Sequence, residues 1–147
     1  MRMAILAGLI VLFAGCGADE QASLSGPLTY ERGGGLAGRR DRLVVRPDGS
    51  ATLTIRDKAK TVKLTVQTAT KSIQLSDAEL ADLERELAKA DLTSLPADST
   101  SKTPVPDTFG YRVTYDGTTV TADDPAMPAK LRGLASGLGA LVERYDK

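Results

Sequence analysis

The sequence predicts an α+β domain, a mostly antiparallel β-sheet with two α-helices packed on one face. Several short segments alternate apolar and polar residues, and turn sequences such as Pro47-Asp48-Gly49 and Asp116-Gly117 separate them. Two longer segments repeat leucines with the period of a helix. Because strands and helices do not alternate regularly, the crossovers of a parallel sheet are not expected.

The first half of the domain reads as a meander of strands. Alternating patterns predict strands over residues 28–32, 42–46, 51–56 and 61–66, and the polar stretch 68–72 is expected to lead into the first helix. A glycine-rich segment, Gly33-Gly34-Gly35-Leu36-Ala37-Gly38, interrupts the first two strands. Glycines at this density indicate unusual backbone angles or the close approach of another group.

The first helix begins at a recognisable cap. Ser76 and Glu79 have the spacing of a capping box, and a leucine stripe follows until the helix ends near Ala90. After a loop over 97–106, residues 109–115 and 118–122 are predicted to form a hairpin.

The second helix is expected to begin at Asp123-Asp124-Pro125, where an acidic residue would cap it. Its apolar stripe runs from Leu131 to Tyr145. The Asp123-Asp124 pair could also be read as a pair of catalytic carboxylates, but adjacent residues seldom point at one substrate.

The N-terminus resembles a lipoprotein leader. Residues 1–15 combine Arg2 with an apolar run too short to span a bilayer, as in a signal peptide. The run ends in Phe13-Ala14-Gly15-Cys16, which resembles the lipobox of bacterial lipoproteins. That resemblance implies that Cys16 carries the lipid and becomes the mature N-terminus, which would make the protein extracytoplasmic and lipid-anchored to the bacterial cell membrane or outer membrane. The alternative is an ordinary leader with a buried cysteine.

The sequence then divides into a tether and one domain. Residues 16–26 are small and polar and are expected to form a flexible tether, and residues 27–147 are expected to form a single domain. This domain is long enough for one hydrophobic core.

Composition excludes several classes of chemistry. The chain has no histidine, and Cys16 is its only cysteine. A Ser-His-Asp triad, a Cys-His pair and a zinc site made of histidine or thiolate ligands are therefore excluded. The glycine-rich segment is neither a dinucleotide fingerprint nor a P-loop. We expect no enzyme activity, no cofactor and no metal.

Charge argues against a nucleic-acid partner but leaves an acidic one open. The chain has 19 basic and 19 acidic residues, so it lacks a net basic footprint. Basic residues outnumber acidic ones in the first half of the mature chain, and acidic residues outnumber basic ones in the second half. This polarity could orient a partner, or it could reflect basic hairpins beside an acidic helix. Likewise, Arg39-Arg40-Asp41-Arg42 is either a grip on a phosphate or acidic partner or exposed loop charge.

Four marks occur in the order found in one known family. They are Arg32 to Gly38, the leucine helix followed by Leu92 and a proline, Pro106 to Val113 with its Asp-Gly hairpin, and Val120 with Pro128, Leu131 and Leu134. Together they resemble emfourin, the protealysin inhibitor family, over residues 28–145.

The resemblance implies inhibition of a secreted thermolysin-like zinc metalloprotease. The resemblance does not identify the residues that touch the enzyme. Because such an inhibitor needs an exposed, rigid segment that fills the cleft, the hypothetical contact residues are Gly33, Gly34, Gly35, Leu36, Ala37 and Gly38. Leu36 would suit the apolar primed pocket of such enzymes, or it could fold back into the core. The alternative is a non-inhibitory cell-envelope lipoprotein that binds another protein. A third class, small-ligand binding between sheet and helices, lacks convergent polar groups in the sequence.

Overall fold

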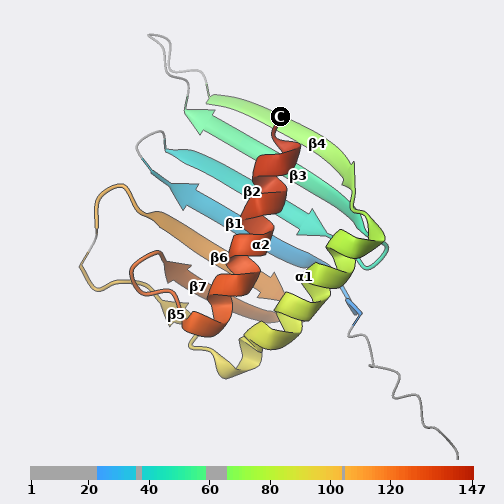
Figure 1. Cartoon of the computed structure of the whole chain (residues 1–147). Helices are drawn as coiled ribbons and strands as arrows, with labels where there is room; N and C mark the ends of the chain where they lie inside the picture. Colours follow the sequence, from blue (N-terminus) through green and yellow to red (C-terminus); the bar gives the residue numbers. More distant parts are fainter. Residues whose placement is uncertain (1–22, 36–37, 59–65, 104) are drawn as a thin grey trace, which may run out of the picture.

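In a computed structural model of the chain, residues 23–35, 38–58, 66–103 and 105–147 are described. They form a seven-stranded sheet in the order β4-β3-β2-β1-β6-β7-β5, and two α-helices cross one of its faces (Figure 1). Paired strands are antiparallel except β5 and β7, which run parallel. The expected α+β class is confirmed.

The elements occur along the chain as follows: β1 (Leu28–Gly34), β2 (Arg39–Val45), β3 (Ser50–Lys58), β4 (Val66–Gln74), α1 (Asp77–Ala90), the 3₁₀ helix η1 (Leu92–Ser94), β5 (Asp98–Ser99), β6 (Phe109–Tyr115), β7 (Thr118–Asp123) and α2 (Ala129–Tyr145).

Three strands differ from the sequence prediction. β2 begins at Arg39, three residues before the expected start at residue 42. The polar stretch 68–72 does not lead into the helix but forms the middle of β4, which pairs with β3 along its whole length. Its β-branched threonines favour a strand, and because β4 lies at the sheet edge it needs no continuous apolar pattern. The strand expected over 61–66 lies outside the described residues except for Val66. β1 also continues through Gly33 and Gly34, since both residues pair with β2 and β6.

The first helix begins as its sequence predicts. The Ser76 hydroxyl accepts a hydrogen bond from the Glu79 amide at 3.3 Å, and the Ser76 amide donates to the Glu79 carboxylate at 2.9 Å. This capping box satisfies two amides that the helix itself leaves without partners. The backbone bond from Ser76 is the main cause that lowers the pKa of Glu79. Asp91, in the left-handed region with φ 45°, ends the helix.

The start of the second helix was predicted wrongly. α2 begins at Ala129 after Pro128, and neither Asp123 nor Asp124 caps it. Asp123 ends β7, and its carboxylate accepts hydrogen bonds from the Ser101 amide at 2.8 Å and the Ala126 amide at 3.0 Å. These bonds tie the chain entering β6 to the chain entering α2, and the backbone bond from Ser101 is the main cause that lowers the pKa of Asp123.

The core lies between the sheet and the two helices. Leu28 and Tyr30 of β1 and Val113 of β6 are fully buried there. The helices contribute Leu83, Leu87, Leu131, Leu134, Leu138, Leu141 and Val142. The four tyrosines also belong to this packing: Tyr30 is buried, and Tyr111, Tyr115 and Tyr145 lie against the core, partly buried.

The packed chain begins before Pro27. Leu24, which the sequence analysis placed in the tether, is only 5% exposed and belongs to the core. Its amide donates to the Glu84 carboxylate at 3.0 Å, and the next residue, Ser25, donates its amide to the Tyr115 hydroxyl at 2.9 Å. Residues 24 and 25 are therefore fixed on the domain by both burial and hydrogen bonds.

This packing yields a stability prediction. A fragment of residues 23–147 should unfold in one cooperative transition, because it keeps the whole core. A fragment of residues 27–147 should be less stable by about 2 kcal/mol, the usual contribution of one buried leucine. Urea unfolding of the two fragments measures the difference, and equal midpoints would show that the contacts of Leu24 contribute nothing.

Candidate functional site

The glycine-rich turn between β1 and β2 has a backbone that side chains would not fit. Gly34, Gly35 and Gly38 have φ angles of 138°, 68° and 57°, which favour glycine. A Cβ on Gly34 would overlap the Thr108 carbonyl oxygen, and one on Gly35 would lie 3.2 Å from the Phe109 ring. The glycines therefore let the β1–β2 hairpin lie directly against the start of β6. Leu36 and Ala37, which follow Gly35 in the sequence, lie outside the described residues.

The start of β6 supports the hairpin on one side. The Gly35 amide donates to the Thr108 carbonyl at 3.3 Å, and the Arg32 guanidinium lies 5.2 Å from the centre of the Phe109 ring. A cation over an aromatic face is attracted to it electrostatically. The Phe109 side chain is thus held between Gly35 and Arg32.

Asp124 fixes this start of β6 in turn. Its carboxylate accepts hydrogen bonds from the Phe109 amide at 2.9 Å and from the Tyr111 hydroxyl at 2.6 Å. Its own amide donates to the Phe109 carbonyl at 3.1 Å. Burial, and then the bond to Asp124, raise the pKa of Tyr111 to about 12. Asp124, which was expected to cap α2, therefore fixes the start of β6, against which the β1–β2 hairpin lies.

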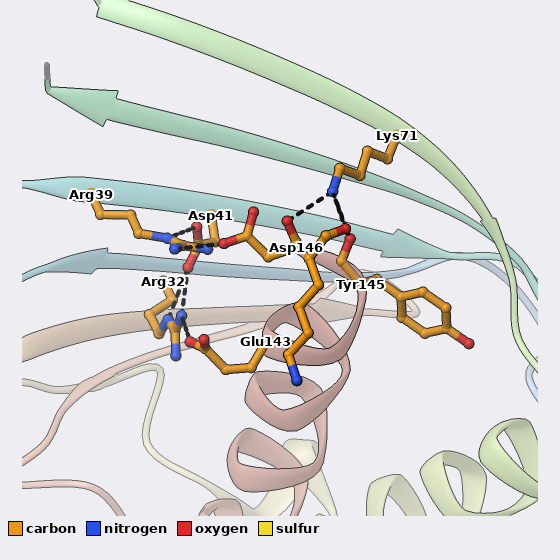
Figure 2. A network of polar contacts seen from close by, with 8 residues as sticks. Arg32, Arg39, Asp41, Lys71, Glu143, Tyr145 and Asp146 are labelled. Atoms are coloured by element: carbon orange, nitrogen blue, oxygen red, sulfur yellow. Dashed lines mark hydrogen bonds and ion pairs between the residues drawn. The ribbon is translucent and has the colours of Figure 1, made fainter.

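A buried ion cluster fixes the base of the hairpin (Figure 2). The Asp41 side chain on β2 is only 1% exposed. It accepts hydrogen bonds from Arg32 of β1 at 2.7 and 3.0 Å and from Nε of Arg39 at 2.6 Å. Because Arg32 lies opposite Asp41 in the strand register, this carboxylate crosslinks the two strands that carry the glycine turn.

The same cluster joins the hairpin to the end of α2. Arg32 also contacts Glu143 at 2.6 Å, and Arg39 contacts Asp146 at 2.8 Å. Burial lowers the pKa of Arg32, but the hydrogen bonds with Glu143 and Asp41 outweigh it and the pKa rises. Both arginines therefore stay charged, which is the state that the three carboxylates require.

Lys71 completes the link between α2 and the sheet. From β4, its ammonium donates to the carbonyls of Tyr145 and Asp146 at 3.0 and 2.8 Å. The last carbonyls of a helix have no partners within it and carry partial negative charge, so a lysine is favourable there.

The structure separates the four charged residues of the segment 39–42. Neither earlier reading, one grip or exposed loop charge, holds for the whole segment, because it lies in β2 and strand alternation points its side chains to opposite faces. Arg39 and Asp41 face the helices, whereas Arg40 and Arg42 are exposed on the face that no helix covers. Sequence reasoning missed the cluster because Glu143 and Asp146, the carboxylates that join Asp41 in it, come from a distant part of the chain.

Val105 is a further residue that sequence reasoning missed. Within the described ranges it is the one large apolar residue that is exposed, with 46% of its surface accessible to solvent. The Thr108 hydroxyl donates to the Val105 carbonyl at 2.9 Å, and Thr108 in turn contacts Gly35. Figure 1 shows the β1–β2 and β5–β6 connections at the same end of the sheet. An exposed apolar residue thus lies in the loop beside the glycine turn.

Other kinds of site find little support in the described part of the chain. No group of three or more potential metal ligands occurs there. None of the helices described there combines the length and apolar character needed to cross a bilayer.

A hollow of about 280 Å³ lies beside Leu24, between α1, η1 and the β6–β7 turn, and Leu87 and Leu92 contribute to its lining.

A comparison with known protein families shows which family the chain belongs to. The model of the family Emfourin matches residues 59–139. The chain belongs to the emfourin family. The matched range contains α1, η1, the β6–β7 hairpin and the first part of α2, and thus three of the four marks in the sequence.

Membership of the emfourin family indicates the general kind of function. Emfourin domains are of the protease-inhibitor type and point to a protease as partner in general. An inhibitor-type domain is also consistent with the expectation that the protein is not an enzyme. The matched range begins after the glycine turn, so it does not test the hypothesis that Gly33 to Gly38 contact a protease. A search of curated proteins gave no match.

The ion cluster predicts an unequal response to two similar substitutions. Asp41→Asn should destabilise the protein by about 3 kcal/mol or more, because it leaves two partly buried guanidinium groups without their shared carboxylate. Asp82→Asn removes an exposed carboxylate that contacts Arg85 on α1, and it should cost less than about 1 kcal/mol. Urea unfolding measures both. A loss below about 1 kcal/mol for Asp41→Asn would contradict the role given to the cluster.

Proposed function

We propose that this emfourin domain inhibits a secreted thermolysin-like metalloprotease and that the turn from Gly33 to Gly38 enters the enzyme's cleft. The observation that carries the proposal is the bracing of this turn. Phe109 and Thr108 support it on one side, and the Asp41 cluster fixes its base. A segment held rigidly before binding loses little conformational entropy when a cleft closes around it.

The chemistry of the tip fits an apolar pocket. Leu36 lies between Gly35 and Ala37 in the sequence, so small neighbours flank one large apolar residue. A cleft can approach such a segment closely. Val105, exposed in the adjacent loop, offers a second apolar contact to the same enzyme surface.

The first test uses a substitution at the tip. The purified full chain, kept in non-ionic detergent, should slow peptide hydrolysis by thermolysin at equimolar concentrations. Leu36→Asp should weaken inhibition by about 1 to 3 kcal/mol, the contribution of one buried leucine, with an unchanged melting temperature. Leu36→Met should retain inhibition, because methionine keeps the apolar volume.

Two results would contradict parts of this proposal. If Leu36→Asp unfolds the domain, Leu36 is a core residue and the contact lies elsewhere. If the folded wild-type protein inhibits none of a panel of thermolysin-like enzymes, the inhibitor proposal fails and the envelope interaction protein becomes the better interpretation.

We further propose that a lipid on Cys16 anchors the protein on the outer side of a bacterial membrane. The support is the sequence Phe13-Ala14-Gly15-Cys16 after a short apolar run. Two or three acyl chains would hold the protein firmly, since each buried CH₂ contributes about 0.8 kcal/mol.

Replacing the lipidated residue tests the anchor. Cys16→Ser should either release the protein from membranes or leave it unprocessed at its larger size, since serine cannot form the thioether. Membrane fractionation and immunoblotting report both outcomes, with Ser23→Ala as a control that should stay in the membrane fraction. A Cys16→Ser protein of mature size that remains membrane-bound would exclude the proposal.

A further inference from the structure

One face of the sheet carries no helix in the part of the chain that the structure describes. On β1, β2, β3 and β6, the residues that alternate with the core residues point to this open face. Its central positions are Glu31, Arg40, Arg42, Thr54, Arg56, Thr68, Gly110, Arg112 and Thr121, and they line a shallow hollow of about 760 Å³. The open face is therefore rich in arginine and threonine.

The strand register places the charges in two adjacent rows. In one row, Glu31 lies opposite both Arg42 and Arg112. Its carboxylate is 3.3 Å from the first guanidinium and 3.9 Å from the second, and both arginine side chains remain 58% exposed. One carboxylate is thus shared between two arginines that keep most of their surface in solvent.

In the other row two like charges face each other. Arg40 lies directly opposite Arg56, and both are exposed. No carboxylate of the described residues forms an ion pair with either one. Like charges in directly opposed positions destabilise a sheet, so this pair costs stability in the free protein. An external carboxylate bound between the two would remove that cost.

The open face lacks features that are common in binding sites for nucleic acids and other polyanions. The open-face positions of the described strands carry no aromatic side chain on which a nucleobase or sugar ring could stack. Glu31, in the middle, would repel a polymer with negative charge at every unit. The pattern of positive groups around one negative group instead favours a surface on which separate carboxylates surround a basic or neutral group.

We propose that the open face is a second interaction surface, which binds an acidic protein partner with carboxylates placed opposite Arg40, Arg56 and Arg112. This proposal does not depend on protease inhibition, because the glycine turn and the open face use different side chains. Gly110 on β6 has no side chain on this face, and a Cβ there would meet only the Gly33 carbonyl oxygen at 3.7 Å, so a partner's backbone can approach the sheet at this position.

The test uses a fluorescent peptide of five Glu-Ser repeats as the acidic probe, because its neutral residues separate the carboxylates. Binding to the full chain in non-ionic detergent is followed by fluorescence anisotropy at low salt and should weaken as salt is added. The double variant Arg40→Ala/Arg56→Ala should lose about tenfold or more in affinity. Arg46→Ala/Arg132→Ala removes the same charge from exposed positions outside this patch and should lose less than about twofold. Glu31→Gln should bind the probe more tightly than wild type.

Several results would overturn the proposal. They are the absence of binding of the Glu-Ser peptide at low salt, an equal loss in the two double variants, and tighter arginine-dependent binding of polyphosphate or of phosphatidylglycerol vesicles. Sedimentation that shows copies of the chain associating through these arginines would assign the face to a second copy instead. Because Arg40 and Arg56 are exposed and repel each other, melting temperatures at or above wild type are expected and exclude misfolding as the cause.

Discussion

The buried carboxylate of Asp41 is the constraint on which the rest of the functional end depends. A charge at 1% exposure is tolerable only when it is paired and hydrogen-bonded, and here Arg32 and Arg39 supply both conditions. The two arginines extend the pairing to Glu143 and Asp146, so a single cluster joins β1, β2 and the last turn of α2. Removing Asp41 would leave both guanidinium groups without their shared buried partner. The glycine turn is therefore held by a group of charges that must stay together, and its orientation follows from the packing of the helix layer.

Glycine and aromatic packing complete what the ion cluster begins. Glycines usually make a turn adaptable, yet a side chain at Gly34 would overlap the Thr108 carbonyl oxygen, and one at Gly35 would press against the Phe109 ring. Close packing thus replaces the freedom that glycine has in an unfolded chain. Asp124 adds two side-chain hydrogen bonds that keep Phe109 in place. The described part of the turn is thus held by packed neighbours, as a cleft-binding inhibitor would need.

The sequence predicted what depends on local patterns and missed what depends on distant pairing. The capping box of Ser76, the leucine stripes and the Asp116-Gly117 hairpin are encoded within a few residues, and the α+β architecture follows from them. Segment 68–72 was missed because an edge strand with one uncovered face needs no apolar alternation. Asp124 was misread because an aspartate before a helix resembles a cap, and only the fold brings Phe109 and Tyr111 to it. The Asp41 cluster depends on Glu143 and Asp146, a hundred or so positions away in the chain, so no motif could reveal it.

Strand alternation also determines which charged side chains face the interior and which face solvent. It places Arg39 and Asp41 inside, where they hold the turn, and Arg40 and Arg42 outside, where they face solvent. The ends of the sheet differ as well: Ser25 contacts Tyr115 at the end of β6, whereas the glycine turn contacts Phe109 at its start. The seven-residue strand between them spans about 20 Å. With a lipid on Cys16, the chain as far as Ser23 could extend at most about 25 Å from the membrane. The proposed anchor would therefore hold the pole nearest Ser25 close to the bilayer and leave the glycine turn at the far pole. An inhibitory element in that position would meet secreted enzymes before the membrane obstructed them.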